Sequence, residues 1–498
     1  MNRDRLFLGS CFSLISTSVC FAVIGAIMGS LKRQFALSNE EIGYIGGAAI
    51  WGFTISIFVL GPLIDALGMK NLMRFAMLCH LAGAIIMILT RPNAAFWMLF
   101  SGALILSFGN GTVEAVCNPL IATLYPDQKT KKLNQFHVWF PGGIVIGGVA
   151  AFLLGREVVT NLLNDMDLEP WRVTVALILI PTILYAILFT GQKFPATERV
   201  QSGVTFGGMV RGALGRPLFL VLLLCMCITA SLELGPGRWV PAVLEAGGIA
   251  GILILAYING LMAVLRSFAG PVIHRLSPTG ILVGSAILAG AGLYWFSFAE
   301  STAMAFASAT VFAVGVCYFW PTMLGVVSER VPKSGALGLA LMGGMGMLIV
   351  GLVTAPQMGR ISDGYLHQQL DREQTRAALQ RVVEVYPAAA VGQPQVIRDE
   401  AAAAVSAATK VLTARELPEG DTAGALRTAI SNNPGGDEAS AVVEDIQGVL
   451  NPADNYGGRM SFRYVAPFSI VIIIVFGGLY VRDRKAGGYA VETIGGGS

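Results

Sequence analysis

The sequence predicts an all-α membrane protein in which twelve transmembrane helices form two bundles of six. Three observations support this fold class. Of the 498 residues, 54% are hydrophobic and only 13% are charged, whereas a soluble chain of this length would expose far more charge. Apolar segments of about 20 residues, long enough to cross a bilayer, recur along the chain. The polar connections between them alternate between basic and nearly free of basic residues.

The apolar segments are separated by short polar connections. The first segment is long enough to span the bilayer, so we expect a helix there and no cleavable signal peptide. The seven cysteines all fall in apolar segments without metal-ligand spacing, so we expect neither disulfides nor a metal site. The expected transmembrane helices lie near residues 7–31, 41–62, 71–90, 95–125, 135–155, 170–190, 217–240, 248–270, 279–298, 303–327, 335–358 and 462–481.

Basic residues set the expected orientation, because positively charged loops stay on the cytoplasmic side. With the N-terminus inside, the stretches facing the cytoplasm carry most of the lysines and arginines. The short outside loops carry few, chiefly Lys32, Arg33, Arg91 and Arg156. We therefore expect a multi-pass protein of the inner (plasma) membrane with both termini in the cytoplasm.

The two halves of the chain resemble each other. Gly61-Pro62-Leu63-Ile64 follows the second span and Gly270-Pro271-Val272-Ile273 follows the eighth. Six spans, a polar linker and six further spans indicate a duplicated transporter, with its site between the repeats. The expected units are residues 1–190 (first bundle), 191–216 (linker), 217–362 (spans seven to eleven), 363–460 (an insertion) and 461–498 (span twelve and tail).

The insertion at 363–460 is polar and rich in alanine. Aliphatic and charged residues alternate at helical spacing, which predicts helices outside the membrane. We expect an extracytoplasmic helical cap or appendage, with a partner-docking or substrate-gathering role as the alternative. Five prolines are expected to break it into short helices: Pro387, Pro394, Pro418, Pro434 and Pro452.

The fourth span carries a carboxylate in an apolar setting. Asn110, Glu114 and Asn118 recur every four residues and would form one polar stripe on a helix. A charged group inside a membrane span costs roughly 3 kcal/mol or more unless it faces a partner or water. Glu114 is therefore a candidate for function, and the alternative is a protonated structural carboxyl hydrogen-bonded to a neighbouring helix.

The segment GPLIDALGMKNLMR, residues 61–74, resembles the signature G-x-L-x-D-x-x-G-x-K/R of the major facilitator superfamily. The resemblance covers everything except the insertion and implies the twelve-helix fold of that family. It also implies that the acidic residue of the signature helps to latch the two halves on the cytoplasmic side. The latch residues that it implies are Gly61, Asp65, Gly68 and Lys70.

Within that superfamily the chain is most similar to the fucose/hexose–proton symporter branch. The motifs that carry this likeness are EAVCNP at 114–119, Leu133-Asn134, SLELGPGRW at 231–239, FWPT at 319–322 and APQMG at 355–359. The likeness implies proton coupling through Glu114. Symporters of this branch also carry an aspartate in the first span, where this chain has no acid and Gly25 aligns, so the resemblance does not extend to coupling through two carboxylates. The substrate-binding residues that we expect are Asn110, Asn118, His137, Trp139, Glu233, Trp239 and Arg266.

Several of these residues have structural alternatives. Arg266 needs an anion or a carbonyl partner in the membrane, so it either pairs with Glu233, contacts substrate or extends to the cytoplasmic surface. His137 either binds substrate, relays protons or is a satisfied structural histidine. Tryptophans in the spans either line the site or anchor the chain at the membrane surface.

We expect a secondary transporter of a small polar solute, a monosaccharide (hexose or deoxyhexose), moving by alternating access with proton symport. The alternatives are an uncoupled facilitator, a carrier of another organic solute, or a transporter-like solute sensor. No nucleotide-binding loop, metal cluster or pair of catalytic carboxylates occurs, so we expect neither a cofactor nor an enzyme. The expected partners are the sugar, the proton and the lipid bilayer, with no nucleic acid, and the expected state is a monomer.

Overall fold

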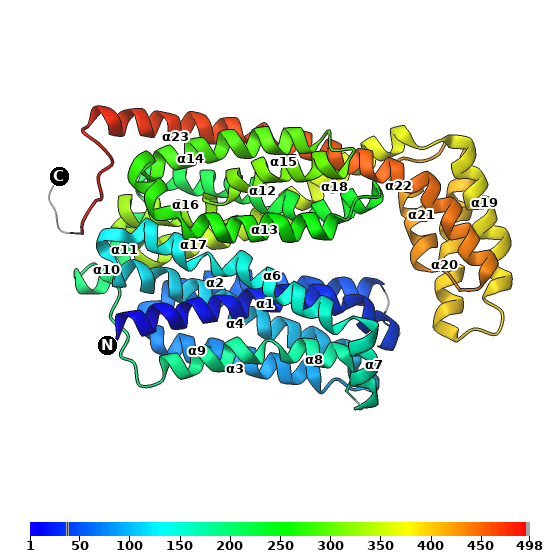
Figure 1. Ribbon diagram of the computed structural model, residues 1–498, viewed down its shortest axis with the longest axis horizontal. Helices are drawn as coiled ribbons and strands as arrows, with labels where there is room; N and C mark the ends of the chain where they lie inside the picture. The colour runs from blue at the N-terminus through cyan, green and yellow to red at the C-terminus, as the bar shows by residue number, and fades with distance from the viewer. Residues whose placement is uncertain (36, 38, 167, 495–498) are drawn as a thin grey trace.

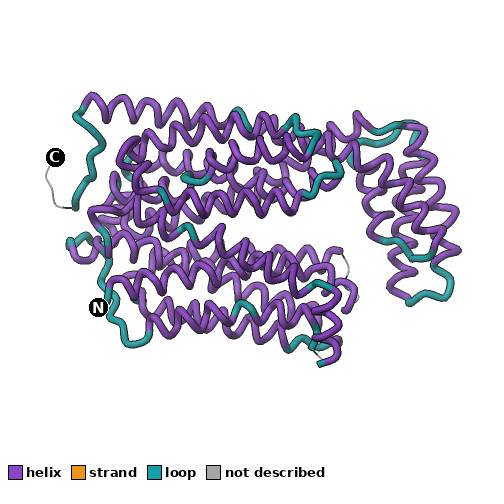
Figure 2. Tube along the Cα trace, in the orientation of Figure 1, coloured by secondary structure: helices purple, strands orange, loops and turns teal. Residues whose placement is uncertain are grey.

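The backbone is helical throughout. The computed structural model describes the whole chain except residues 36, 38, 167 and 495–498, and no strand occurs among the residues it describes (Figure 2). This follows from the long apolar segments, because a helix satisfies its own backbone N–H and C=O groups within one segment and needs no water. The predicted all-α class is confirmed.

The first half of the chain supplies the lower layer of helices in Figure 1, drawn in blue to cyan. Short connections join consecutive spans, which therefore run antiparallel. In order, they are α1 (Arg3–Phe35), α2 (Asn39–Leu67), α3 (Met69–Ile88), α4 (Ala95–Leu124), α5 (Lys129–Phe136), α6 (Trp139–Leu154), α7 (Glu157–Asp165), α8 (Pro170–Ala176) and α9 (Leu179–Phe189).

A linker with two short helices, α10 (Glu198–Gln201) and α11 (Phe206–Leu214), leads to the second half. This half forms the upper layer in Figure 1. Its helices are α12 (Pro217–Ala246), α13 (Gly251–Ser267), α14 (Ala269–Phe296), α15 (Thr302–Val316), α16 (Phe319–Arg330), α17 (Gly335–Ile349), a short π-helix (Val350–Thr354), α18 (Ala355–Gln369), α22 (Asp437–Val465) and α23 (Phe468–Lys485).

Eleven helices of the described chain are long and apolar enough to cross a membrane. The span expected at 248–270 corresponds to α13, which is apolar but has only 17 residues. A typical crossing needs about 20 residues, so α13 falls just short of that length. That α13 is the twelfth membrane crossing stays a prediction.

Prolines divide three of the expected spans into pairs of helices, namely α5 with α6, α8 with α9, and α15 with α16. Proline has no N–H and cannot donate to the carbonyl four residues before it, so the helix is interrupted there and that carbonyl loses its usual donor. The pairs of proline and carbonyl residue are Pro141 with His137, Pro181 with Leu177 and Pro321 with Cys317. The Leu177 carbonyl accepts instead from the N–H of Ile180 at 3.3 Å, whereas the other two have no backbone donor in the described chain.

The two halves meet along two seams at the end of the bundle that carries both termini, here called the termini end (Figure 1). Between α2 and α17, a Cβ added to Gly61 would lie 2.2 Å from the Cβ of Ala340. Between α5 and α16, a Cβ added to Gly325 would lie 2.2 Å from Thr130 Oγ1. Toward the opposite end, here called the insertion end, the ribbons of the two halves diverge (Figure 1).

The insertion packs as a small helical unit beyond the bundle, seen at the right of Figure 1. It contains α19 (Arg372–Ala389), α20 (Gln395–Leu412), α21 (Asp421–Ser431) and the first part of α22. Its apolar core is separate from those of the membrane helices and includes Leu379, Val411 and Ile446. Because α18 and α22 run directly into it, the insertion is attached to the second half of the chain.

The expectation that five prolines break the insertion into short helices is wrong at two of them. Pro387 lies inside α19 and Pro452 lies inside the 29-residue α22. The carbonyls that these prolines leave without a helical donor belong to Val383 and Gly448, which are at least partly exposed. Water can satisfy such carbonyls, so the helices continue through both prolines.

The insertion also approaches the first half. Lys32, near the end of α1, lies with its Nζ 4.0 Å from Glu400 Oε1 on α20. Both side chains are about one quarter exposed. The insertion therefore extends from the second half across to the first at the insertion end of the bundle.

Candidate functional site

A buried carboxylate lies in the middle of α4. Glu114 is only 3% exposed, and its Oε2 accepts a hydrogen bond of 2.7 Å from the Nδ2 of Asn118, one turn further along. The same Nδ2 donates to the Glu114 carbonyl at 2.9 Å. The spacing of four residues therefore places the amide against the carboxyl, as the sequence predicted for these two residues.

His137 extends this pair toward the interface between the halves. It lies just after the last residue of α5, with its Nε2 3.1 Å from Asn118 Oδ1 and 4.0 Å from Glu114 Oε2. Since the amide oxygen of Asn118 can only accept, Nε2 must carry a proton and donate it. The histidine thus serves as a donor to the Glu114–Asn118 pair in either of its charge states.

Arg266 on α13 joins the two halves at this point. It is 1% exposed, and its guanidinium donates to three acceptors. Nη1 donates to the His137 carbonyl at 2.9 Å, Nε to the Cys317 carbonyl at 2.5 Å and Nη2 to Glu233 Oε1 at 3.0 Å.

The two carbonyls bound to Arg266 are among those that prolines leave without a helical donor. Pro141 follows His137 by four residues and Pro321 follows Cys317 by four, so neither carbonyl has a backbone N–H to accept from in its own helix. An unpaired carbonyl in a membrane interior is unfavourable, because no water is available to hydrogen-bond it. One guanidinium therefore satisfies two broken helices, one from each half, together with a carboxylate.

Glu233 and Asn134 each present a buried oxygen without a donor. Glu233 on α12 is 8% exposed, and its Oε2 has no hydrogen-bond partner among the described residues. Asn134 on α5 donates to Thr322 Oγ1 at 3.2 Å, but its Oδ1 also has no partner in the described chain. The site therefore offers free acceptors, while every guanidinium nitrogen of Arg266 is already used.

The two predicted tryptophans lie toward the insertion end from these groups. Trp139 is the first residue of α6 and is 36% exposed, and its carbonyl accepts from Ser18 Oγ at 3.2 Å. Trp239 on α12 is partly buried, and a Cβ added to Gly359 on α18 would lie 3.6 Å from its ring. Neither residue hydrogen-bonds to the Glu114 group through its side chain in the structure.

Asn110 does not join this group. Its Oδ1 lies 2.9 Å from His80 Nε2, and His80 Nδ1 lies 3.0 Å from the hydroxyl of Tyr185. Residues four apart on a helix differ by about 40° in direction, so Asn110 and Asn118 differ by about 80°. Asn110 therefore faces the interior of the first half, and the structure gives it the surroundings of a structural group.

The implied latch residues lie at the termini end. Asp65 accepts hydrogen bonds from Thr197 Oγ1 at 2.6 Å and from Arg199 Nε at 2.7 Å, both in the linker. Arg199 in turn lies against the start of α17, because a Cβ added to Gly335 would be 3.3 Å from the Arg199 Cβ. Asp65 thus reaches the second half through the linker.

The other latch residues contribute backbone geometry and position. Gly61 allows α2 and α17 to touch. Gly68 has a φ of 80°, a left-handed conformation that glycine adopts without strain. Lys70 lies in the first turn of α3 and is partly exposed.

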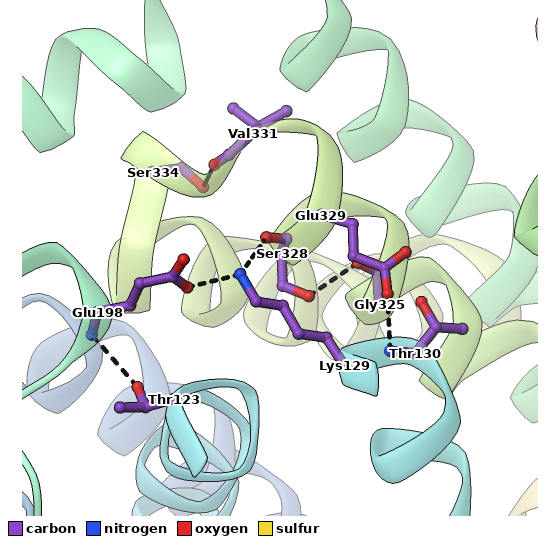
Figure 3. A network of polar contacts seen from close by, with 9 residues as sticks. All are labelled: Thr123, Lys129, Thr130, Glu198, Gly325, Ser328, Glu329, Val331 and Ser334. Carbon is purple, nitrogen blue, oxygen red and sulfur yellow. Dashed lines mark hydrogen bonds and ion pairs between the residues drawn. The ribbon is translucent and has the colours of Figure 1, made fainter. Parts of the chain in front are cut away.

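A second inter-half contact at the termini end was not predicted. The sequence indicated Lys129 only as part of a topology signal, yet it is 2% exposed, and its Nζ donates to Glu198 Oε2 at 2.6 Å and to the Ser328 carbonyl at 3.1 Å. Beside it, the N–H of Thr130 donates to Glu329 Oε1 at 2.9 Å. Figure 3 shows Lys129 extending from α5 between the linker and α16.

Four charged or titratable side chains lie buried together where the halves meet, namely Glu114, His137, Glu233 and Arg266. The two short helices α5 and α16 run from these groups to the contacts at the termini end. The interface can therefore separate there only if the hydrogen bonds of Lys129 and Thr130 to α16 break.

Comparisons with known proteins agree with this architecture. Residues 6–355 match the family model of the Major Facilitator Superfamily. A gentisate transporter of Corynebacterium glutamicum is 24% identical over 369 residues, covering 70% of this chain and 78% of that protein.

Two solved structures share the fold. The E. coli proton:xylose symporter XylE, bound to 6-bromo-6-deoxy-D-glucose, superposes with a TM-score of 0.60 at 15% identity, over 72% of this chain and 88% of that one. The E. coli fucose:proton symporter FucP superposes with a TM-score of 0.56 at 18% identity, over 71% and 92%. With its family model matched over most of its length and its fold shared with these transporters, the chain belongs to the Major Facilitator Superfamily of membrane transporters.

Proposed function

We propose that this protein is a proton-driven symporter of a small neutral polyhydroxylated solute, a monosaccharide, working by alternating access. The observation that carries the choice of solute is the Glu233 Oε2 atom, a buried acceptor to which no group of the described chain donates with hydrogen-bond geometry. Asn134 Oδ1 adds a second one. A buried polar atom without a partner costs about 1–3 kcal/mol, so a ligand rich in hydroxyl donors recovers that cost when it binds.

The charges of the site support proton coupling. Glu114 and Glu233 ionised, with Arg266 charged, give the group a net charge of −1, and one proton on Glu114 brings it to zero. A site with no net charge crosses the low-dielectric region at lower cost than a charged one. Loading with one proton and one neutral solute therefore favours the change of access.

The hydrogen bonds also connect the proton site to the solute site. Glu114 accepts from Asn118, Asn118 accepts from His137, and the His137 carbonyl accepts from Arg266, which holds Glu233. A change in the charge of Glu114 alters the strength of the first bond and, through the chain, the position of Arg266. Binding of proton and solute then reinforce each other, and by linkage the effect is reciprocal.

The closed seams at the termini end support an outward-facing state of a protein whose termini lie inside. The basic residues at that end agree with a cytoplasmic location under the positive-inside rule. We place the protein in the inner membrane as a monomer, with the insertion and the insertion end of the bundle on the outside.

A second candidate substrate is an aromatic carboxylate, because one relative is a gentisate transporter. A carboxylate needs a cation, and the guanidinium of Arg266 already donates to Glu233 and two carbonyls. A second carboxylate would have to share this guanidinium with Glu233 through its two remaining N–H groups, and it would bring a further negative charge into a buried site that already carries two carboxylates. The geometry therefore favours a neutral solute.

Uptake into proteoliposomes tests the proposal. Purified protein is reconstituted and offered radiolabelled hexoses, deoxyhexoses, pentoses and gentisate, with the outside more acidic than the inside or with equal pH. We expect one or more sugars to accumulate above equilibrium only with the pH gradient, and a protonophore to abolish this. Accumulation of gentisate but of none of the sugars would refute the choice of solute, and sugar uptake indifferent to the gradient would refute the coupling.

A further inference from the structure

We propose that the C-terminal tail, residues 486–494, holds the contact between the halves at the termini end closed, with Tyr489 as the residue that positions Glu329. This inference rests on the alternating access of the proposed function. It concerns a segment that follows the last transmembrane helix and that the sequence indicated only as a tail.

Glu329 is the hub of the contact. It is 6% exposed at the end of α16, and its two carboxylate oxygens have different partners. Oε1 accepts from the N–H of Thr130 across the interface at 2.9 Å, while Oε2 accepts from the hydroxyl of Tyr489 at 2.8 Å. The tail therefore holds one oxygen of the carboxylate whose other oxygen joins the halves.

The first turn of α5 favours a fixed carboxylate at this place. The Thr130 N–H is one of the amides at the start of a helix that has no helical acceptor of its own, and the helix dipole attracts negative charge there. A glutamate side chain has several rotatable bonds, so holding one of its oxygens in place reduces the entropy lost when the other meets Thr130.

The tail is tied to the second half at further points. The N–H of Glu492 donates to the Glu329 carbonyl at 2.8 Å, and the Glu492 carboxylate pairs with Arg216 at 2.7 Å. The guanidinium of Arg330 lies 4.3 Å from the centre of the Tyr489 ring. The tail reaches this position by a turn at Gly487 and Gly488, whose φ angles of 92° and 130° favour glycine.

Tyr489 is well suited to remain a donor. Burial, together with the neighbouring Glu329 carboxylate, raises its pKa well above the ordinary value of 10. Its hydroxyl therefore stays protonated at every physiological pH. A cavity of about 410 Å³ lies beside these contacts and is lined by the tail and both halves, including Lys131 and Arg275. Separation of the halves at this end would pull its walls apart and leave the tail with the second half.

The linker makes a similar contact with the first half, and this parallel supports a structural role for the tail at the gate. The linker follows the first bundle as the tail follows the second. The N–H of Glu198 donates to Thr123 Oγ1 at 3.3 Å, at the end of α4. Glu492 makes the matching bond to Glu329 at the end of α16. Both helices end just before a proline that opens a short 3-10 turn, Pro126 and Pro332.

The test measures opening at the termini end in the full chain. Spin labels on cysteines at Arg74 and Arg482, which are exposed on α3 and α23, report the separation of the halves in lipid nanodiscs by pulsed electron resonance. All seven native cysteines are buried, so background labelling is low. Tyr489→Phe removes the hydroxyl and keeps the ring beside Arg330.

We expect Tyr489→Phe to raise the ratio of open to closed molecules a few-fold, since a Glu329 side chain that is no longer held loses more rotamer entropy when its other oxygen meets Thr130 in the closed state. Tyr480→Phe is the matched control, because this tyrosine lies nearby on α23 and its hydroxyl has no hydrogen bond to the described residues. Glu329→Gln should open the gate as well, and adding Tyr489→Phe to it should change little further.

An unchanged distance distribution in Tyr489→Phe would overturn the proposal, and so would additive effects of Tyr489→Phe and Glu329→Gln. The readout is independent of the solute. If the parent accumulates no sugar but Tyr489→Phe opens the gate, the choice of solute fails and the role of the tail stands. If the parent accumulates sugar normally but Tyr489→Phe does not open the gate, the role of the tail fails and the choice of solute stands. If the parent shows no longer label-to-label distance under any condition, the halves do not separate at the termini end and the proposed alternating access is refuted.

Discussion

Removal of the Arg266 guanidinium should destabilise the fold through two separate effects, and the structure allows them to be measured apart. Arg266→Met removes the charge and all the donors but keeps an unbranched apolar side chain. It leaves Glu233 buried without a counter-charge, which costs about 3–5 kcal/mol. It also leaves the His137 and Cys317 carbonyls without donors, and hydrogen bonds inside membrane proteins average about 0.6 kcal/mol each.

The sum is about 4–6 kcal/mol, against a typical total stability of 5–15 kcal/mol for a folded protein. Two sets of second substitutions separate the contribution of the unpaired charge from that of the two carbonyls. Glu233→Gln in the Arg266→Met background removes the unpaired charge and should recover most of the loss. Pro141→Ala together with Pro321→Ala restores the two backbone donors, and should recover about 1 kcal/mol more beyond any gain from removing the prolines.

Thermal unfolding in detergent gives the order of stability of these variants. Unfolding is monitored by the reaction of a fluorescent thiol reagent with the buried cysteines as they become exposed. The two proline substitutions are also made in the parent, where Arg266 already satisfies the carbonyls, and this measures their general effect on the helices. Equal instability of Arg266→Met and Arg266→Met/Glu233→Gln would refute the ion-pair part of the reasoning. A gain from the proline substitutions that is the same in both backgrounds would refute the carbonyl part.

Three further predictions follow from the site and the insertion. Glu114→Gln mimics the protonated carboxyl, so it should exchange sugar across proteoliposome membranes but not accumulate it from a pH gradient; accumulation equal to that of the parent would make Glu114 structural. Trp239→Cys should react with a water-soluble thiol reagent added outside and should be protected by the transported sugar, whereas a cysteine without reaction in any state would lie in packed protein or lipid. Lys32→Cys/Glu400→Cys should be joined by a short bis-maleimide and lose transport, because the cross-link ties the insertion on the second half to the first half; full transport after complete cross-linking would contradict this.

Local spacing was sufficient to predict part of the site. Glu114 and Asn118 are four residues apart on one helix, so their contact follows from the sequence. The need of Arg266 for an anion or a carbonyl also followed from its place in an apolar span. Which of these partners it takes did not, because Glu233, His137 and Cys317 belong to three other spans, and their distances depend on how the halves pack.

Other features could not be read from spacing alone. Asn110 faces His80, since the small angular drift between residues four apart becomes decisive over eight. Lys129 resembled a surface charge because its partners are 69 and 199 residues away. A usable signal did exist for Arg266, namely a proline four residues after His137 and another four after Cys317. Such prolines mark carbonyls that must find donors elsewhere.

The seam between α5 and α16 gives a physical route from the site to the gate. At one end, Arg266 bonds the carbonyls of His137 and Cys317, just after α5 and just before α16. In the middle, Asn134 donates to Thr322, and at the far end Glu329 accepts from Thr130. α5 has only eight residues, about 12 Å of helix, and a helix this short moves as one body. A shift of Arg266 when solute or proton binds therefore changes the contacts at both ends of α5 together. An element that contacts both the binding site and the gate can couple them, because events at either end bias its position.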